Sequence, residues 1–322
     1  IAEAIGYNYS DCGAFVYIMN ILFEKTASFL IILLLGTALR HTGILRPEDK
    51  RLLSFLCMNV TLPAAIIVSF SRAEISIKWL AVAAVGFLLN WISIGLGWLL
   101  SIGRTKQSRA AWCLGFTGYN LGSFLIPMAQ QMLSPSMVSL ICIFDFGNGL
   151  MTLGGNNAAV SAIISDGRGF DLRAFGRTLL RAPALVTEAL MIILTLSGVR
   201  MPQSLVNVLS PIAEANFFLP ILLVGVMLDV KLPRDKLRHV MQLVAVRTAM
   251  TVVTAAVLWL CLPMDEQARA AIVLCCCAPI SVMSSLYISN CGADESVSSM
   301  AYSIYVFISI PLIFAAMSIL GL

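Results

Sequence analysis

Residues 111–133 read AWCLGFTGYNLGSFLIPMAQQML, a stretch long enough to cross a lipid bilayer and apolar at both ends. Its middle does not suit a regular helix. Gly115, Gly118 and Gly122 lack side chains, and Pro127 lacks a backbone donor. A helix broken at bilayer depth is tolerated only where its freed N–H and C=O groups face protein or a water-filled cavity. This stretch therefore predicts a broken membrane helix beside other protein or a cavity.

A second stretch has the same defect. Residues 270–289 read AAIVLCCCAPISVMSSLYIS, with Pro279 in the middle and several serines after it. If the first stretch breaks near Gly118–Asn120 and the second at Pro279, four half-helix ends meet in the middle of the membrane. Two of these ends are N-termini, whose unpaired N–H groups and partial positive charge suit an anion.

The composition is that of a membrane protein. The 322 residues are 59% hydrophobic and 12% charged, and the mean hydropathy is +0.91. Repeated apolar runs of about 20 residues indicate a polytopic α-helical protein in a lipid bilayer. The net charge of +4 does not indicate nucleic acid, because the basic residues of such a protein belong mainly to the loops on one side. The nine cysteines form no CxxC pair, His41 lies just after a predicted span and His239 lies at the first turn of another, so we predict no metal site and no cofactor.

The apolar runs predict ten spans, at residues 16–40, 52–71, 77–101, 110–133, 136–164, 174–198, 205–229, 238–262, 269–290 and 295–321. The chain then divides into a tail, a first half, a cytoplasmic linker and a second half, at residues 1–15, 16–164, 165–173 and 174–322. Fifteen of the 21 Lys and Arg residues lie in the loops after spans 1, 3, 5 and 7. The positive-inside rule puts these loops in the cytoplasm and both termini on the opposite side.

The two halves share short sequence matches at nearly one offset. QSRAA at 107–111 matches QARAA at 267–271, GILRP at 43–47 matches GVRMP at 198–202, and Pro63 matches Pro220. Five spans per half is an odd number, so the second half is inverted relative to the first. We therefore predict an all-α fold of ten transmembrane helices in two inverted five-helix repeats, with the broken helices 4 and 9 crossing. Kinks are expected at Pro63, Pro127 and Pro220.

The residues around the crossing are the candidate substrate-binding residues. They are Tyr119, Asn120, Gly122, Asp145, Asn148, Pro279, Ser281, Ser284 and Ser285. Gly, Ser and Pro could instead serve only close helix packing. We favour a substrate site because two broken helices occupy matching positions in the two halves.

Asp145 lies inside an apolar span, where a carboxylate costs at least ~2.5 kcal/mol unless it is paired, hydrated or protonated. It is the candidate coupling group, as a proton carrier, and it could also bind a cation or orient the substrate. The alternative is a structural carboxylate bonded to helix ends or a serine. Asn148 lies on the same helix face, three residues further on. For Arg247, which follows Asn90 by the repeat spacing, we favour a structural role.

Several motifs resemble the auxin efflux carrier family. GILRPEDKRLLSFLCMNVTLP at 43–63 is similar to its first loop and second helix, and residues 120–127, 145–148 and 278–295 are similar to its fourth, fifth and ninth helices. The resemblance extends over about 19–320. It implies the ten-helix inverted repeat, divided into a scaffold part and a transport part, and substrates such as malonate-like carboxylates or auxin-like weak acids. The short linker and the TGYN at 117–120 resemble the bacterial-type members.

We therefore predict a secondary transporter of a small organic anion, working by alternating access in the bacterial inner membrane. Proton coupling and a homodimer are further expectations. An enzyme is not favoured, because no predicted span carries a histidine in its interior or a second acid matching Asp145. Two alternatives stay open. One is an ion-coupled carrier like the bile-acid symporters, and the other is a channel or sensor of the same fold.

Overall fold

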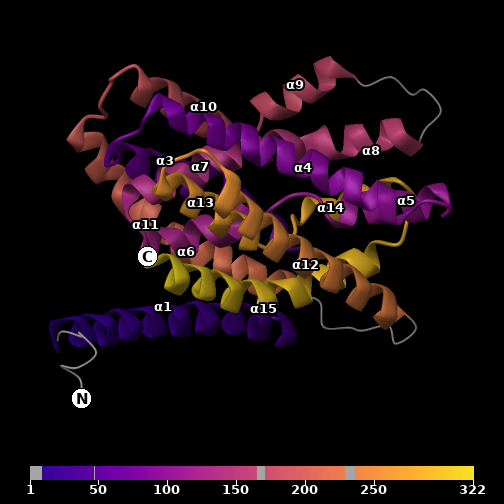
Figure 1. The fold of residues 1–322 in the computed structure, drawn as a ribbon, viewed down its shortest axis with the longest axis horizontal. Coiled ribbons are helices and arrows are strands. Elements are labelled where there is room, and N and C mark those ends of the chain that lie inside the picture. Colours follow the sequence, from indigo (N-terminus) through magenta and orange to yellow (C-terminus); the bar gives the residue numbers. More distant parts are fainter. Residues whose placement is uncertain (1–8, 47, 165–170, 229–235) are drawn as a thin grey trace.

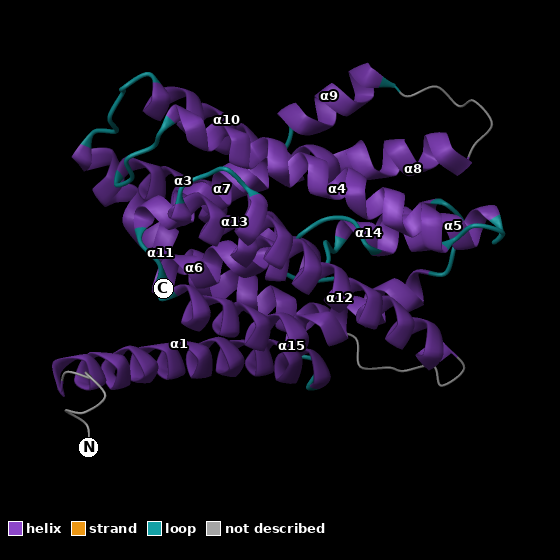
Figure 2. Ribbon diagram, in the orientation of Figure 1, coloured by secondary structure: helices purple, strands orange, loops and turns teal. Residues whose placement is uncertain are grey.

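The structure is a computed structural model, and it describes residues 9–46, 48–164, 171–228 and 236–322. These residues form helices joined by loops, with no β-strand among them (Figure 2). The predicted all-helical fold is confirmed for this part of the chain. Parts of the predicted tail (residues 1–8) and of the predicted linker (165–170) lie outside the described residues.

The described residues of the first half form twelve helical segments, three of them π-helical (η2, η4 and η5) and one a 3₁₀ turn (η3). In chain order they are α1 (Tyr9–His41), α2 (Lys50–Leu56), η2 (Cys57–Thr61), α3 (Leu62–Ser71), η3 (Ile77–Trp79), α4 (Leu80–Leu100), α5 (Lys106–Gly115), η4 (Leu121–Leu125), α6 (Ile126–Met132), α7 (Pro135–Leu150), η5 (Met151–Gly155) and α8 (Asn156–Ile164). The described part of the second half contains α9 (Leu172–Leu180), α10 (Pro183–Leu196), α11 (Gln203–Met227), α12 (Leu237–Cys261), α13 (Glu266–Cys277), α14 (Met283–Asn290) and α15 (Glu295–Leu320).

Within the described residues, six helical stretches are long and apolar enough to cross a membrane, and a seventh counts if α9 and α10 form one bent span. The six are 50–71, 77–100, 135–164, 203–227, 237–261 and 296–320. The ten-helix inverted repeat stays a prediction. The two breaks are present, because α5 ends at Gly115 before η4 begins at Leu121, and α13 ends at Cys277 before α14 begins at Met283.

The stretch predicted as a span at 174–198 is bent in the structure. The chain bends by 78° between α9 and α10. Pro183, the first residue of α10, cannot donate to the preceding turn, and it favours the extended conformation seen at Ala182. None of the α9 side chains is buried, and its sequence is amphipathic. In addition, α1 already begins at Tyr9, inside the segment that we predicted as a tail.

Polar side chains compensate the backbone near the prolines. Pro63 and Pro127 each lie just after a π-helical turn, η2 and η4. The Asn59 amide donates to the Phe55 carbonyl (2.8 Å), and the Thr61 hydroxyl to the carbonyl of Cys57 (3.3 Å). These side chains bond to carbonyls of α2 and η2, in the turns before Pro63. Pro220 lies inside α11.

The helices pack as two groups. The first group contains α1, α2, η2, α3, α10 and α11, with α11 against α1 and α3, and α10 against α3. The second contains α4 to α8 with η4 and η5, and α12 to α15, with α4 against α7 and α13 between α7 and α12. Figure 1 shows α1 along one margin of the molecule and α9 along the opposite margin. The groups meet where α7 contacts α3 and α10, and where α6 and η4 contact α11.

The contact between α4 and α7 depends on glycine. A Cβ atom at Gly147 would overlap the carbonyl of Ala83, so the two backbones touch directly. Gly147→Ala should therefore force the helices apart and lower the stability by about 1–3 kcal/mol. The matched control is Gly95→Ala on α4, where an added Cβ meets open space. Thermal unfolding of the purified variants measures the difference, and equal midpoints would contradict this packing.

Candidate functional site

The two breaks pair with each other. The Asn120 N–H donates to the carbonyl of Pro279 (2.8 Å), and the Ser281 N–H donates to the carbonyl of Gly118 (3.3 Å). The result is a single antiparallel β-bridge, in which Tyr119 of the first break lies opposite Ile280 of the second. Each broken helix thus supplies hydrogen-bond partners for the other, which the apolar interior of a membrane requires.

Gly118 makes this close approach feasible. Its φ of +76° lies in the left-handed region, which favours glycine. An added Cβ would lie 2.5 Å from the Cβ of Ser281 and 2.9 Å from the Cγ2 of Thr152. Backbone conformation and space both require glycine at this position.

The side chain of Asn148, which belongs to α7, forms hydrogen bonds with the backbone of the first break. Its Oδ1 accepts from the Tyr119 N–H (3.1 Å) and from the Asn90 amide (3.2 Å). Its Nδ2 donates to the Tyr119 carbonyl (2.9 Å) and to Oδ1 of Asp145 (2.9 Å). Asn148 is buried, and these four bonds use its full hydrogen-bonding capacity. The amide therefore positions the break.

Asn90 supports the same backbone from α4. Its Oδ1 accepts from the Gly118 N–H (2.8 Å) and from the Asn156 amide (3.1 Å). Buried amides from α4, α7 and α8 thus form one connected network around residues 118 and 119. The Oδ1 of Asn156 is buried and has no hydrogen-bond partner, so the network is complete around residues 118 and 119 but not at α8.

Arg247 contacts the break from α12. The side chain is fully buried, so it does not extend to the membrane surface. Its guanidinium donates to the carbonyls of Phe116 and Gly118, and its carbon lies 4.5 Å from the ring centroid of Tyr119. No carboxylate of the described residues forms an ion pair with it. A cation beyond the C-terminal end of α5 offsets the negative end of that helix dipole.

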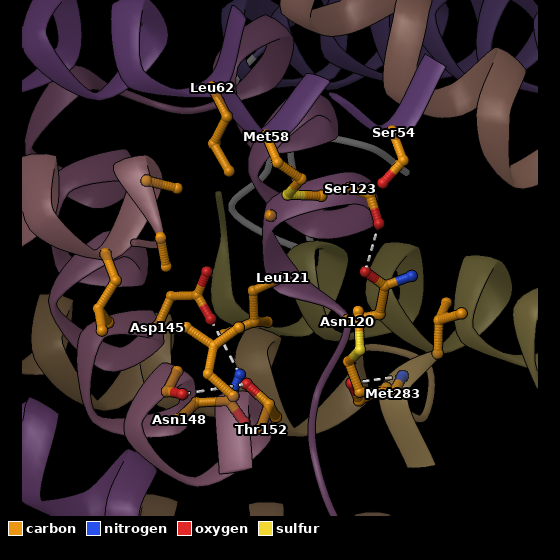
Figure 3. A pocket seen from close by; sticks show the side chains of 18 of the residues that line it. Ser54, Met58, Leu62, Asn120, Leu121, Ser123, Asp145, Asn148, Thr152 and Met283 are labelled. Atoms are coloured by element: carbon orange, nitrogen blue, oxygen red, sulfur yellow. Dashed lines mark hydrogen bonds between the residues drawn. The ribbon is translucent and has the colours of Figure 1, made fainter. Parts of the chain in front are cut away.

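A cavity of about 770 Å³ lies between the two helix groups. Figure 3 shows Ser54, Met58 and Leu62 on one side of it, facing Asp145 and Asn120 on the other. Six of the nine predicted substrate-binding residues line this cavity: Tyr119, Asn120, Gly122, Asp145, Asn148 and Ser281.

The other three predicted residues do not line the cavity. Pro279 accepts the hydrogen bond from Asn120 at the crossing. The hydroxyl of Ser284 donates to the carbonyl of Thr117 (3.0 Å), and that of Ser285 donates to the hydroxyl of Ser298 (3.1 Å). The two serine hydroxyls thus connect α14 to the first break and to α15.

The polar groups nearest the first break belong to Asn120 and Ser123. The Ser123 hydroxyl donates to Oδ1 of Asn120 (2.5 Å), and Nδ2 of Asn120 donates to the Tyr302 hydroxyl (3.3 Å). A Cβ built at Gly122 would lie 3.7 Å from Oδ2 of Asp145, so this carboxylate oxygen faces the backbone where η4 begins.

Sequence reasoning missed one wall of the cavity. Lys50, Ser54, Met58 and Leu62 line it from α2, η2 and α3. Their spacing of four places them on one helix face, and this signal was available in the sequence. Arg51 also lines the cavity, and both basic side chains are exposed. Their charges therefore lie where the cavity meets solvent.

Residues 21–157 match the sequence model of the family described as Membrane transport protein, which is the auxin efflux carrier family. The predicted resemblance is confirmed over this stretch, which contains the first break, Asp145 and Asn148. No significant match was found among the curated proteins. The family and the apolar helices together support an integral membrane protein of a transporter family.

Arg247→Met should remove the guanidinium donor from the Phe116 carbonyl in an apolar interior, and lower the stability by about 1–3 kcal/mol, while the Gly118 carbonyl keeps its bond from the Ser281 N–H. Arg238→Met, an exposed position on the same helix, is the matched control and should unfold as the wild type does. Thermal unfolding in detergent checks this. Equal destabilisation by both substitutions would mean that Arg247 does not support the crossing.

Proposed function

We propose that this chain, which carries the membrane transport protein pattern over residues 21–157, is a secondary transporter of a small organic anion. The observation that carries the proposal is the cavity between two helix groups, whose wall includes the crossing of two broken helices. Malonate-like carboxylates and auxin-like weak acids are the substrate classes, and transport proceeds by alternating access.

The cavity suits a small organic molecule. Its volume of about 770 Å³ lies in the usual range of roughly 300–1,000 Å³ for ligand sites. Its lining is largely apolar, with a few hydroxyl and amide groups near the crossing. An apolar cavity of this kind binds the apolar part of a small ligand, and its few polar groups orient the polar end of that ligand.

The carboxylate of the substrate would lie at the start of η4. Helix N-termini carry unpaired N–H groups and partial positive charge, and η4 continues into α6 to form a stretch of two helical segments ending at Met132. Ser123 and the Asn120 amide add side-chain groups beside these N–H groups. Lys50 and Arg51 at the solvent-exposed part of the cavity would raise the local concentration of anions.

The location of the cavity supports alternating access. Its walls come from both helix groups, so a displacement of one group relative to the other changes access to the crossing. Few polar bonds connect the groups near the first break. The Asn216 amide donates to Gln130 (2.9 Å), and Lys25 donates to Gln131 (3.2 Å).

Two contacts at the ends of the spans support the proposed orientation in the membrane. The Trp79 indole donates to Asp265 (2.8 Å); Trp79 lies at the start of the span predicted at 77–101, and Asp265 lies in a loop predicted on the same, non-cytoplasmic side. Lys236 pairs with Asp294, and both lie in loops predicted on the cytoplasmic side. Lys50 and Arg51 belong to a loop that is also predicted on the cytoplasmic side. The cavity is then open toward the cytoplasm in this state, with the protein in a bacterial inner membrane. Homodimer formation stays a prediction.

Uptake of labelled malonate and indole-3-acetate into proteoliposomes tests the proposal. The wild type should show saturable uptake and counterflow, which a channel does not. Asn120→Ala removes the amide at the crossing and should lower kcat/KM by about tenfold, as expected for one lost hydrogen bond. Asn207→Ala, an exposed asparagine on α11, is the control and should transport normally.

Two results would contradict the proposal. Folded wild-type protein that transports no small carboxylate would rule out the substrate class. Normal kinetics in Asn120→Ala would mean that the substrate does not bind at the crossing.

A further inference from the structure

Glu188 of α10 is a buried acid, and one of its carboxyl oxygens has no hydrogen-bond partner. The side chain is 2% exposed, and it lines the cavity. Its Oε1 is buried and has no hydrogen-bond partner. An ionised carboxylate in such a place is costly unless it is paired or neutralised.

A second acid faces the same cavity from the other helix group. Asp145 lies on α7, which packs against α10, and both acids line the same cavity. Oδ1 of Asp145 accepts from Asn148 (2.9 Å), while Oδ2 faces Gly122. The two acids therefore lie on opposite sides of the contact between the helix groups.

The surroundings supply no buried counter-charge. Among the described residues, the ion pair found is Lys236–Asp294, so neither acid is paired with a lysine or arginine there. The other titratable groups close to the two acids are thiols, on Cys142 of α7 and Cys275 of α13. Of the elements packed on α10, α3 has no titratable side chain and η2 has the Cys57 thiol. The basic residues at the cavity and on α9 are all exposed: Lys50, Arg51, Arg173, Arg177 and Arg181.

We propose that Asp145 and Glu188 form a proton-binding site that bridges the two helix groups, with one proton held by the pair. The inference rests on the proposed transport function. Two acids in one cavity of low dielectric disfavour each other's ionised form, so that one proton on the pair is favoured. A proton on Glu188 also neutralises a buried carboxyl whose Oε1 has no hydrogen-bond partner.

The position of the pair couples the proton to movement. With the helix groups as they stand, the acids interact and the pair retains a proton taken from water in the cavity. A displacement of the groups separates the acids, removes their mutual repulsion and returns the proton to water on the other side. The bound proton also removes one negative charge near Gly122, which favours an anion beside Asn120 and Ser123. Anion and proton would therefore move together.

Infrared spectroscopy of the lipid-reconstituted protein tests the proton site without any substrate. The wild type should show a protonated-carboxyl band at neutral pH, and Glu188→Gln should remove it. Glu214→Gln, an exposed acid on α11, is the matched control and should retain the band. A wild type without this band, or a band that Glu188→Gln leaves unchanged, would overturn the proposal. Unchanged thermal unfolding of both variants establishes that they are folded.

Malonate uptake driven by an imposed proton gradient tests the coupling. Glu188→Gln and Asp145→Asn should lose the gradient-driven accumulation and keep malonate exchange, whereas Glu214→Gln should keep both. Gradient-driven accumulation that persists in Glu188→Gln would overturn the coupling role. If the wild type carries no malonate while the infrared result is as expected, the substrate proposal fails and the proton site stands.

Discussion

The structure depends on one constraint, which is that backbone groups freed inside a membrane need partners. Two helices are interrupted here, and each satisfies the other through the bonds between Asn120 and Pro279 and between Ser281 and Gly118. Neither break would be stable in lipid alone. The crossing then determines what surrounds it, since Asn148, Asn90 and Arg247 all bond to the backbone of the first break.

The same constraint explains which parts of the site were predictable from the sequence. Gly118, Pro127 and Pro279 are residues whose backbone chemistry opposes a continuous helix, so both breaks could be predicted without a structure. The bend at Pro183 was equally available from the rule that a residue preceding proline avoids the helical conformation, although the span predicted at 174–198 named no bend there.

The partners of the polar side chains could not be predicted. A buried asparagine can form hydrogen bonds with a substrate or with a neighbouring backbone segment. Here Asn148 bonds to the backbone of Tyr119. Ser284 similarly bonds to the Thr117 carbonyl. Distances between helices far apart in the sequence decide these pairings. For the same reason the two acids, which belong to different halves of the chain, gave no joint signal, although each is visible as an acid in an apolar run.

The distribution of charge gives the site its character. Positive charge is exposed at the cavity on Lys50 and Arg51, and it is buried behind the crossing on Arg247. The acids that line the cavity are Asp145 and Glu188, which lie between the helix groups. An anion that enters this cavity thus meets attraction near solvent and at the crossing, and repulsion from the acids unless they are neutralised. This arrangement makes the protonation state of the acids relevant to anion binding.

The central claim is that a carboxylate binds where the crossing faces the cavity, and substrate protection of a thiol tests it most directly. A cysteine in place of Ser123 would be reacted with a water-soluble maleimide, with Ser285→Cys and the native cysteines as the background. Malonate or another transported carboxylate should slow the reaction at position 123 and leave position 285 unchanged. A reaction rate at position 123 that no transported carboxylate alters would contradict the account.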